Sequence, residues 1–265
     1  MIPFYFGAPN RRLFGCYQSP PPGLHRDTGV LLCYSMGEEY TRFHRLYHLL
    51  ARHLSQAGFP AMRFDLYGCG DSEGDFEQAR IDDWLADVSA AIDELRRRSN
   101  ASTICLAGLR LGGTLAMMSG AERGDVRGLV LWDPVTNGRA YLHELGDLHQ
   151  YMLRWAHVRP PRHQSEEGPT ELLGYPLADS LRADLEALNL ATVQQRPADH
   201  VLLIESHEVL SQRNLAEHLG RMEIRVAYQR QPQPQTWLWR EDVGRALVAY
   251  PLLQAVVRWV SEVFP

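Results

Sequence analysis

The chain has 265 residues, of which 45% are hydrophobic and 22% charged, and its formal net charge is −5. This size and balance fit one globular α/β domain with an insertion, and they exclude the broad basic surface that nucleic acid or an anionic membrane requires. All 27 basic residues are arginine, which excludes a Schiff-base lysine, a P-loop lysine and a Ser–Lys dyad.

The cysteines and the apolar runs indicate the cellular compartment to expect for this protein. The four cysteines form no CxxC pair, and Cys33 and Cys105 lie in apolar runs typical of strands, so we expect reduced core cysteines. The short apolar start lacks the basic region of a signal peptide, and no apolar run approaches the roughly 18 residues of a membrane span. We therefore expect a soluble cytoplasmic protein, without a metal, a cofactor or a nucleic-acid partner.

Strands and helices are predicted in alternation along most of the chain. Short apolar runs predict strands at residues 2–7, 13–18, 30–34, 59–65, 102–107, 126–132, 200–205 and 223–228. Apolar residues at helical spacing predict helices at residues 41–57, 81–95, 111–121, 210–219 and 246–263. The first two strands form an edge hairpin, and the remaining alternation predicts a mainly parallel twisted sheet with helices on both faces.

The alternation lapses between residues 138 and 197. Helix-compatible runs at 140–156 and 181–190 flank a segment rich in Pro, Glu and His at 159–169. We expect this insertion to form a helical lid over the carboxyl ends of the strands. Residues 1–137 and 198–265 would then form the core, with a Gln- and Pro-rich loop at 229–235 before the last helix.

The central motif is Gly108-Leu109-Arg110-Leu111-Gly112, between a predicted strand and a predicted helix. Small residues at both ends of such a pentapeptide are typical of a nucleophile elbow, whose middle residue is strained and whose glycines let the helix pack against the strand. An ester or amide hydrolase carries serine at the middle position. Here it is Arg110.

Three further segments resemble one family in the right order: the loop at residues 64–72 (FDLYGCGDS), the turn Gly37-Glu38-Glu39-Tyr40, and residues 131–135 (LWDPV). Over nearly its whole length the chain resembles an α/β-hydrolase, most of all the serine-aminopeptidase-like hydrolases. Within them it is similar to the hydrolase-like proteins that accompany exosortase systems and some biosynthetic clusters, in which an arginine at the elbow recurs. The resemblance implies an α/β-hydrolase fold.

The resemblance also implies where the catalytic groups of a serine hydrolase would lie. It assigns the two backbone N–H donors of an oxyanion hole to Met36 and Leu111, and such donors do not depend on the side chain. The nucleophile is absent, because the guanidinium of Arg110 stays protonated and cannot attack a carbonyl.

The base and the acid are also missing or displaced. No histidine follows His218, and the family's histidine position falls near Glu241. The position of the triad acid falls near Glu208. A Ser-His-Asp mechanism is therefore excluded at this site, and any acid/base chemistry would use Arg110 with Glu241, Glu208 or Asp133.

Two interpretations of Arg110 remain open. A planar cation beside a helix N-terminus and free N–H groups favours an anion, such as a carboxylate, a phosphate or the phosphopantetheine arm of a carrier protein. Alternatively, Arg110 pairs internally with Asp133, Glu208 or Glu241 and blocks the old active site.

Other residues near the expected pocket are Tyr34, Ser35 and His207, which we include as substrate-binding candidates. Ser35 is not at an elbow, and His207 follows a predicted strand as a turn residue would. His44 and His48 have the spacing of metal ligands on a helix, but they lie off its apolar stripe, which favours a solvated flank.

Three functions follow. The first is a hydrolase-like protein without serine chemistry that binds an anionic or acyl small molecule, or an acyl-carrier arm, either as a binder or with acid/base catalysis. The second is an active ester, thioester or amide hydrolase using directly activated water or another nucleophile, such as Ser35 or a cysteine. The third is a pseudoenzyme scaffold for a partner enzyme.

Overall fold

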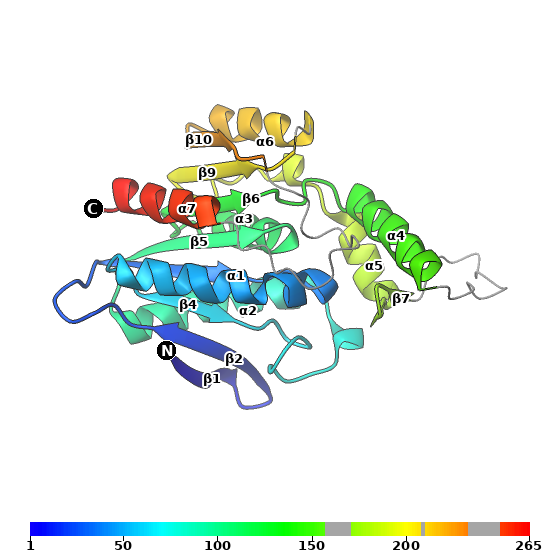
Figure 1. The fold of residues 1–265 in the computed structure, drawn as a ribbon, viewed down its shortest axis with the longest axis horizontal. Helices are drawn as coiled ribbons and strands as arrows, with labels where there is room; N and C mark the ends of the chain where they lie inside the picture. Colours follow the sequence, from blue (N-terminus) through cyan, green and yellow to red (C-terminus); the bar gives the residue numbers. More distant parts are fainter. Residues whose placement is uncertain (157–170, 208–209, 233–249) are drawn as a thin grey trace.

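A computed structural model describes residues 1–156, 171–207, 210–232 and 250–265. Within them, eight strands form one sheet in the order β1-β2-β4-β3-β5-β6-β9-β10 (Figure 1). The strands are β1 (Ile2–Ala8), β2 (Arg11–Gln18), β3 (Thr28–Cys33), β4 (Ala61–Phe64), β5 (Thr103–Leu109), β6 (Gly128–Trp132), β9 (His200–Glu205) and β10 (Arg225–Arg230). The order of neighbours departs from chain order, as it must when parallel strands are joined through helices.

The β1–β2 hairpin is antiparallel and lies at one edge, as predicted, and β2 pairs antiparallel with β4. From β4 to β10 every pairing is parallel. The parallel strands β3, β5 and β6 are buried on both faces, which explains why they are continuous apolar runs rather than alternating ones.

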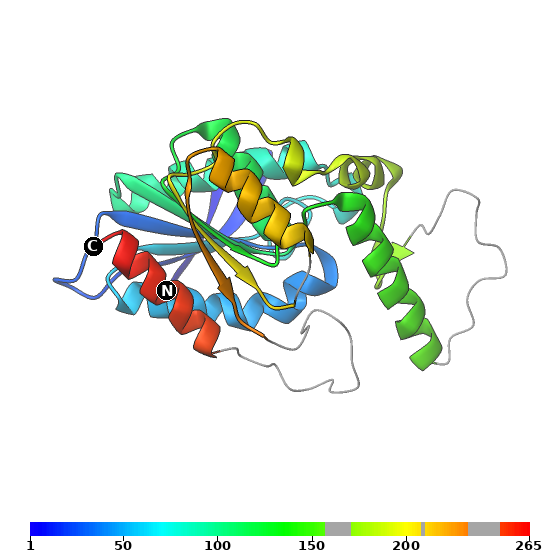
Figure 2. The ribbon, with the colours of Figure 1, turned by 90° about the horizontal axis from the view of Figure 1, so that it is seen from above.

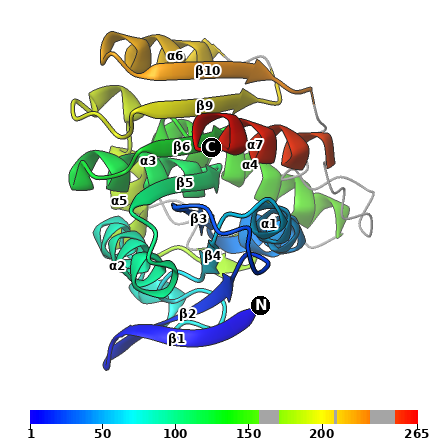
Figure 3. The same ribbon diagram turned by 90° about the vertical axis from the view of Figure 1, so that its left-hand side faces the viewer.

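Helices cover both faces of the sheet (Figure 3). The helices of the core are α1 (Gly37–Gln56), α2 (Ile81–Ser99), α3 (Leu111–Arg123), α6 (Leu210–Arg221) and α7 (Tyr250–Val263). Apolar residues of α1 and α7 pack on one face, and those of α2, α3 and α6 pack on the other. Each large aliphatic side chain buried there stabilises the fold by about 1.5–3 kcal/mol.

Two further helices, α4 (Gly138–Trp155) and α5 (Asp179–Ala187), lie beyond the carboxyl ends of the strands (Figures 1 and 2). Between them is a short hairpin of β7 (Glu171–Leu172) and β8 (Tyr175–Pro176). Asn137 begins α4 by accepting the Ala140 N–H at 3.0 Å, a standard helix cap. This is the segment predicted as a lid, and its residues 159–169 lie outside the described part of the chain.

Boundaries differ from the prediction where chemistry other than hydrophobic spacing decides them. Helix α1 starts four residues earlier than predicted, because two acidic residues, Glu38 and Glu39, occupy its first turn and favour a helix N-terminus. Strand β10 continues through Arg230, so the loop predicted from residue 229 begins later. All four cysteines are buried and unbridged. No helix in the described ranges is long and apolar enough to cross a membrane.

Candidate functional site

The turn between β5 and α3 has the geometry of an elbow. Arg110 has φ 50° and ψ −127°, a conformation that side chains rarely adopt. A Cβ on Gly108 would lie 2.4 Å from the backbone of Gly112, and a Cβ on Gly112 would lie 2.1 Å from the carbonyl oxygen of Cys33. Both glycines are therefore required for α3 to pack against β5 and the end of β3.

The Arg110 side chain lies between two carboxylates and is 8% exposed. Its Nε donates to Glu39 Oε1 at 3.0 Å, and its Nη2 donates to Glu144 Oε2 at 2.6 Å. The guanidinium carbon also lies 5.4 Å from the ring centroid of Tyr141. Burial lowers the pKa of Arg110, but the two carboxylates raise it more, so the net shift is upward and the group stays charged.

Glu39 is the fixed acid of this cluster. It lies in the first turn of α1, and its Oε2 accepts hydrogen bonds from the Tyr141 hydroxyl at 3.0 Å and from the Ser35 hydroxyl. Burial raises the pKa of Tyr141, and the charge of Glu39 raises it further, so Tyr141 remains a proton donor. Ser35 is buried and engaged with Glu39 instead of lying open as a nucleophile.

Of the three acids expected to pair with Arg110, only Asp133 is among the described residues. Asp133 Oδ1 accepts the Ser206 N–H at 2.9 Å, and within the described residues the ion pairs of Arg110 are with Glu39 and Glu144. Among the described residues its Oδ2 is buried without a hydrogen-bond partner, and burial raises the pKa of Asp133. Glu208 and Glu241 lie outside the described residues.

The two segments assigned to the oxyanion donors meet at the elbow. Met36 immediately precedes α1, Leu111 begins α3, and both are buried. The close approach of Gly112 to Cys33 and Tyr34 brings these segments together. An oxyanion hole remains a prediction from the resemblance.

The two remaining candidates, Tyr34 and His207, differ in where they lie. The Tyr34 side chain packs on the face covered by α1, where its hydroxyl accepts a hydrogen bond from Arg63, so the structure does not bring it to Arg110. His207 is half-buried after β9, and its charge lowers the pKa of Asp133, which places it near that carboxyl.

A cavity of about 30 Å³ adjoins the cluster. Met36, Glu39 and Tyr141 line one side of it. Apolar side chains of the α4–α5 segment line much of the rest: Leu145, Leu172, Leu173 and Leu177. This volume holds water molecules and is far below the several hundred Å³ of a typical ligand pocket.

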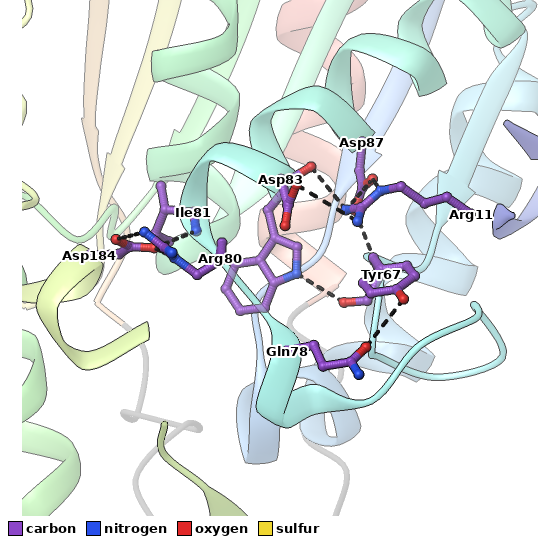
Figure 4. Close-up of polar contacts among 9 residues, drawn as sticks. Arg11, Tyr67, Gln78, Arg80, Ile81, Asp83, Asp87 and Asp184 are labelled. Carbon is purple, nitrogen blue, oxygen red and sulfur yellow. Dashed lines mark hydrogen bonds and ion pairs between the residues drawn. The ribbon is translucent and has the colours of Figure 1, made fainter. Parts of the chain in front are cut away.

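The same segment is fastened to the core at a second point (Figure 4). Asp184 of α5 accepts two hydrogen bonds from Arg80, at 2.6 and 2.9 Å, and a third from the Ile81 N–H at 3.1 Å. It thus serves as the N-terminal cap that α2 does not supply itself. Hydrogen bonds from Arg80 lower the pKa of Asp184.

The residues that sequence reasoning missed are Glu39 and Glu144. Glu39 has a signal, since it lies in the matched turn just after the implied oxyanion donor. Glu144 has none, because only the docking of α4 brings it to the elbow. Among the described residues no cluster of three His, Cys, Asp or Glu side chains is placed to hold a metal ion.

A mainly parallel sheet with an antiparallel hairpin at one edge, a strained elbow after β5 and helices beyond the strand ends together define an α/β-hydrolase fold. The model of a protein family described as serine aminopeptidase, S33, matches residues 25–226. The chain belongs to this family.

Solved structures agree with the fold. Est1E from Butyrivibrio proteoclasticus, with ferulic acid bound, is 17% identical with a TM-score of 0.67, covering 98% of this chain and 96% of that one. A soluble variant of monoglyceride lipase from Saccharomyces cerevisiae, in complex with a substrate analog, is 12% identical with a TM-score of 0.67, covering 100% and 97%. Mouse alpha/beta hydrolase domain-containing protein 10 is 16% identical with a TM-score of 0.61, covering 99% of both chains. A comparison with curated proteins gives no match.

Proposed function

We propose that this protein binds a carboxylate-bearing acyl molecule without forming a covalent intermediate, and that the ligand carboxylate replaces Glu144 on Arg110. The observation that carries this proposal is the asymmetry of the two acids around Arg110. The Glu39 side chain is 4% exposed, whereas that of Glu144 is 33% exposed. One acid is therefore a built part of the core, and the other is a replaceable counterion.

The elbow itself supports the absence of serine chemistry. A guanidinium does not attack a carbonyl, and the Ser35 hydroxyl in this cluster is buried and donates to Glu39. Arg110 does offer Nη2 as a charged donor to whichever carboxylate occupies the position of Glu144. When Glu39 stays in contact with Arg110 and Glu144 moves away, one ligand carboxylate restores the charge balance around Arg110.

The residues that line the cavity support an acyl chain as the rest of the ligand. The lining of the cavity beside Glu39 includes four leucines of the α4–α5 segment and Met36. Apolar walls with a few fixed polar groups are typical of small-molecule sites. We propose that residues 138–197 act as the lid of this site in a cytoplasmic protein, and that its outward movement enlarges the cavity to admit the chain.

Binding of octanoate tests the proposal directly. Glu144→Gln removes the competing carboxylate and should tighten octanoate binding about two- to fivefold, since a partly exposed ion pair contributes up to about 1 kcal/mol. The matched control is Glu186→Gln on α5, which should leave affinity unchanged. Arg110→Met combined with Glu39→Gln should abolish binding while removing both buried charges of the cluster together. Calorimetry measures the affinity, and a hundredfold excess over Kd adds about 2.7 kcal/mol of stability.

Failure of octanoate and longer carboxylates to bind Glu144→Gln would contradict the proposal. The full pairing of Arg110 with two acids then favours the second candidate function, a pseudoenzyme scaffold whose pocket is permanently filled. Turnover of an activated ester or thioester by wild-type protein would instead identify a hydrolase using water or another nucleophile. An acyl chain on a carrier arm lacks a free carboxylate, so a preference for acyl-carrier protein over octanoate would also replace our ligand.

A further inference from the structure

A second buried arginine, Arg63, lies away from the elbow. It is in the middle of β4 and is 7% exposed. Its sheet neighbour Leu32 packs in the cluster beneath α1, and neighbouring residues at one register position point to the same face. The Arg63 side chain therefore lies on the α1 side of the sheet, near the β1–β2 edge, where the chain also begins (Figures 1 and 3).

Every direct partner of Arg63 is neutral. Its Nη1 donates to the Tyr34 hydroxyl at 3.1 Å and lies 3.3 Å from His44 Nε2, and its Nη2 contacts Met1 Sδ at 3.6 Å. Its Nε is buried and has no hydrogen-bond partner in the described part of the chain. Because arginine only donates, His44 Nε2 must accept, which makes His44 neutral with its proton on Nδ1.

The acid nearest to Arg63 along the strand is already engaged. Asp65 directly follows β4, and its oxygens accept the Tyr40 hydroxyl and the Asp71 N–H, both at 3.0 Å. It acts on Arg63 only through space and raises the pKa of Arg63 from there. Across the described ranges no carboxylate forms an ion pair with Arg63 within 4.0 Å.

A buried cation without a bonded anion is costly, by several kcal/mol. Arg110, which is similarly buried, has two carboxylates in contact, so the fold does not leave buried arginines unpaired as a rule. On the edge of Arg63 formed by Nη2 and Nε, Nη2 contacts Met1, which is 62% exposed, and Nε has no hydrogen-bond partner in the described part of the chain. Two parallel N–H donors on one edge of a guanidinium match two oxygens of an anion.

We propose that Arg63, His44 and His48 form a binding site for a phosphate group. The guanidinium edge binds two oxygens, and a protonated His44, whose Nε2 lies 3.3 Å from Arg63 Nη1, adds positive charge beside it. His48 is one helical turn further on, on the same flank of α1, and adds a second imidazolium. The charge of Arg63 together with that of the two imidazoliums favours a doubly charged tetrahedral anion over a single carboxylate. The two histidines, which were predicted to lie on a solvated flank of the helix, then contribute to one binding site.

The charges around these histidines determine the pH dependence. The pKa of His44 is lowered by burial, then by Arg63 and His48, and is raised by Asp71. The pKa of His48 is lowered by burial, then by Arg63, Arg52 and the amino group of the first residue. A bound phosphate offsets the positive field, so binding raises both pKa values and takes up protons. Affinity should therefore rise as pH falls through the histidine range, by up to about tenfold per pH unit for each proton taken up.

The test follows His44 and His48 by NMR while inorganic phosphate, an organic phosphate monoester or sulfate is added. Sulfate keeps both charges between about pH 5 and 8, so its pH profile reports the histidines alone. We expect both pKa values to rise with each anion, while His53, in the last turn of the same helix, stays unchanged. Tighter binding of inorganic phosphate or of the organic monoester shows which of the two is the ligand.

Two variants separate binding from folding. Arg63→Met should remove the response and leave the protein folded, since replacing a buried unpaired charge by an apolar side chain of similar length is often neutral or stabilising. His44→Gln, at an exposed position, should weaken binding at pH 6 much more than at pH 8. Arg45→Met, exposed on the same helix, is the matched control and should bind normally.

An unchanged pKa for both histidines at saturating phosphate refutes the site. So does an equal response in Arg63→Met, which would mean that phosphate acts by ionic strength alone. The inference is independent of the proposed function, because Arg110→Met combined with Glu39→Gln should not alter phosphate binding.

Discussion

Arg110→Met is expected to lower the free energy of unfolding by about 3–5 kcal/mol, because it leaves a buried carboxylate without its cation. After the substitution Glu39 keeps only neutral donors, the hydroxyls of Ser35 and Tyr141. The unfavourable φ of residue 110 is the same for methionine as for arginine, so backbone strain cancels from the comparison.

A double-mutant cycle isolates the ion pair from the packing of the side chain. Glu39→Gln alone should cost about 1–3 kcal/mol, since Arg110 keeps Glu144 and the glutamine oxygen still accepts from Ser35. Combining it with Arg110→Met should recover part of the loss, because no charge is then left buried alone. The coupling energy should lie between about 0.5 and 3 kcal/mol.

Urea unfolding followed by tryptophan fluorescence measures these differences from the shift in midpoint at constant slope. The control is Arg12→Met, which breaks an exposed pair with Glu73 and should cost less than about 1 kcal/mol. If Arg110→Met costs no more than this control, the cluster at the elbow does not stabilise the fold and our description of Glu39 as a fixed acid is wrong.

Three further results are expected. Gly108→Ala should prevent stable folding or cost more than about 4 kcal/mol in the same urea assay, because its Cβ would meet the Gly112 backbone at 2.4 Å. Asp184→Asn weakens the contact with Arg80 and should increase amide hydrogen exchange in α5 and the first turn of α2 while leaving β5 protected. An equal increase in β5 would contradict the conclusion that Asp184 stabilises α5 and α2 locally. Two arginines lower the pKa of Asp125 to about 2, so its contribution is full above about pH 4 and is lost as pH falls toward 2. Asp125→Asn should flatten the Tm profile in that window only.

Most of the fold could be predicted because hydrophobic periodicity and turn residues act locally. The apolar runs of β3, β5 and β6 and the glycines of the elbow each need only their own neighbours along the chain. Helix α1 was predicted to start late because its first turn is polar and carries no hydrophobic signal. The short β7–β8 hairpin was not predicted, since two-residue strands have no periodicity to detect.

The candidate site was only half predictable, for a geometric reason. Arg110 could be found because the elbow is a local motif, but its partners come from elements 71 and 34 residues away. Tyr34 was included because it ends a strand at the pocket, yet successive strand residues face opposite sides of a sheet. Its neighbour Ser35 contacts Glu39 in the cluster, while Tyr34 contacts Arg63 on the α1 side.

The positions of the two acids explain why one of them is replaceable. A cation at the first turn of α3 opposes the dipole of that helix, so Arg110 needs negative charge beside it. Glu39 meets this need from the first turn of α1, where a second helix dipole also favours its charge. Glu144 lies in the interior of α4, away from a helix N-terminus, and its carboxylate contacts Arg110. A ligand carboxylate therefore competes with the less stabilised of the two acids, and raising salt should weaken the hold of Glu144 before that of Glu39.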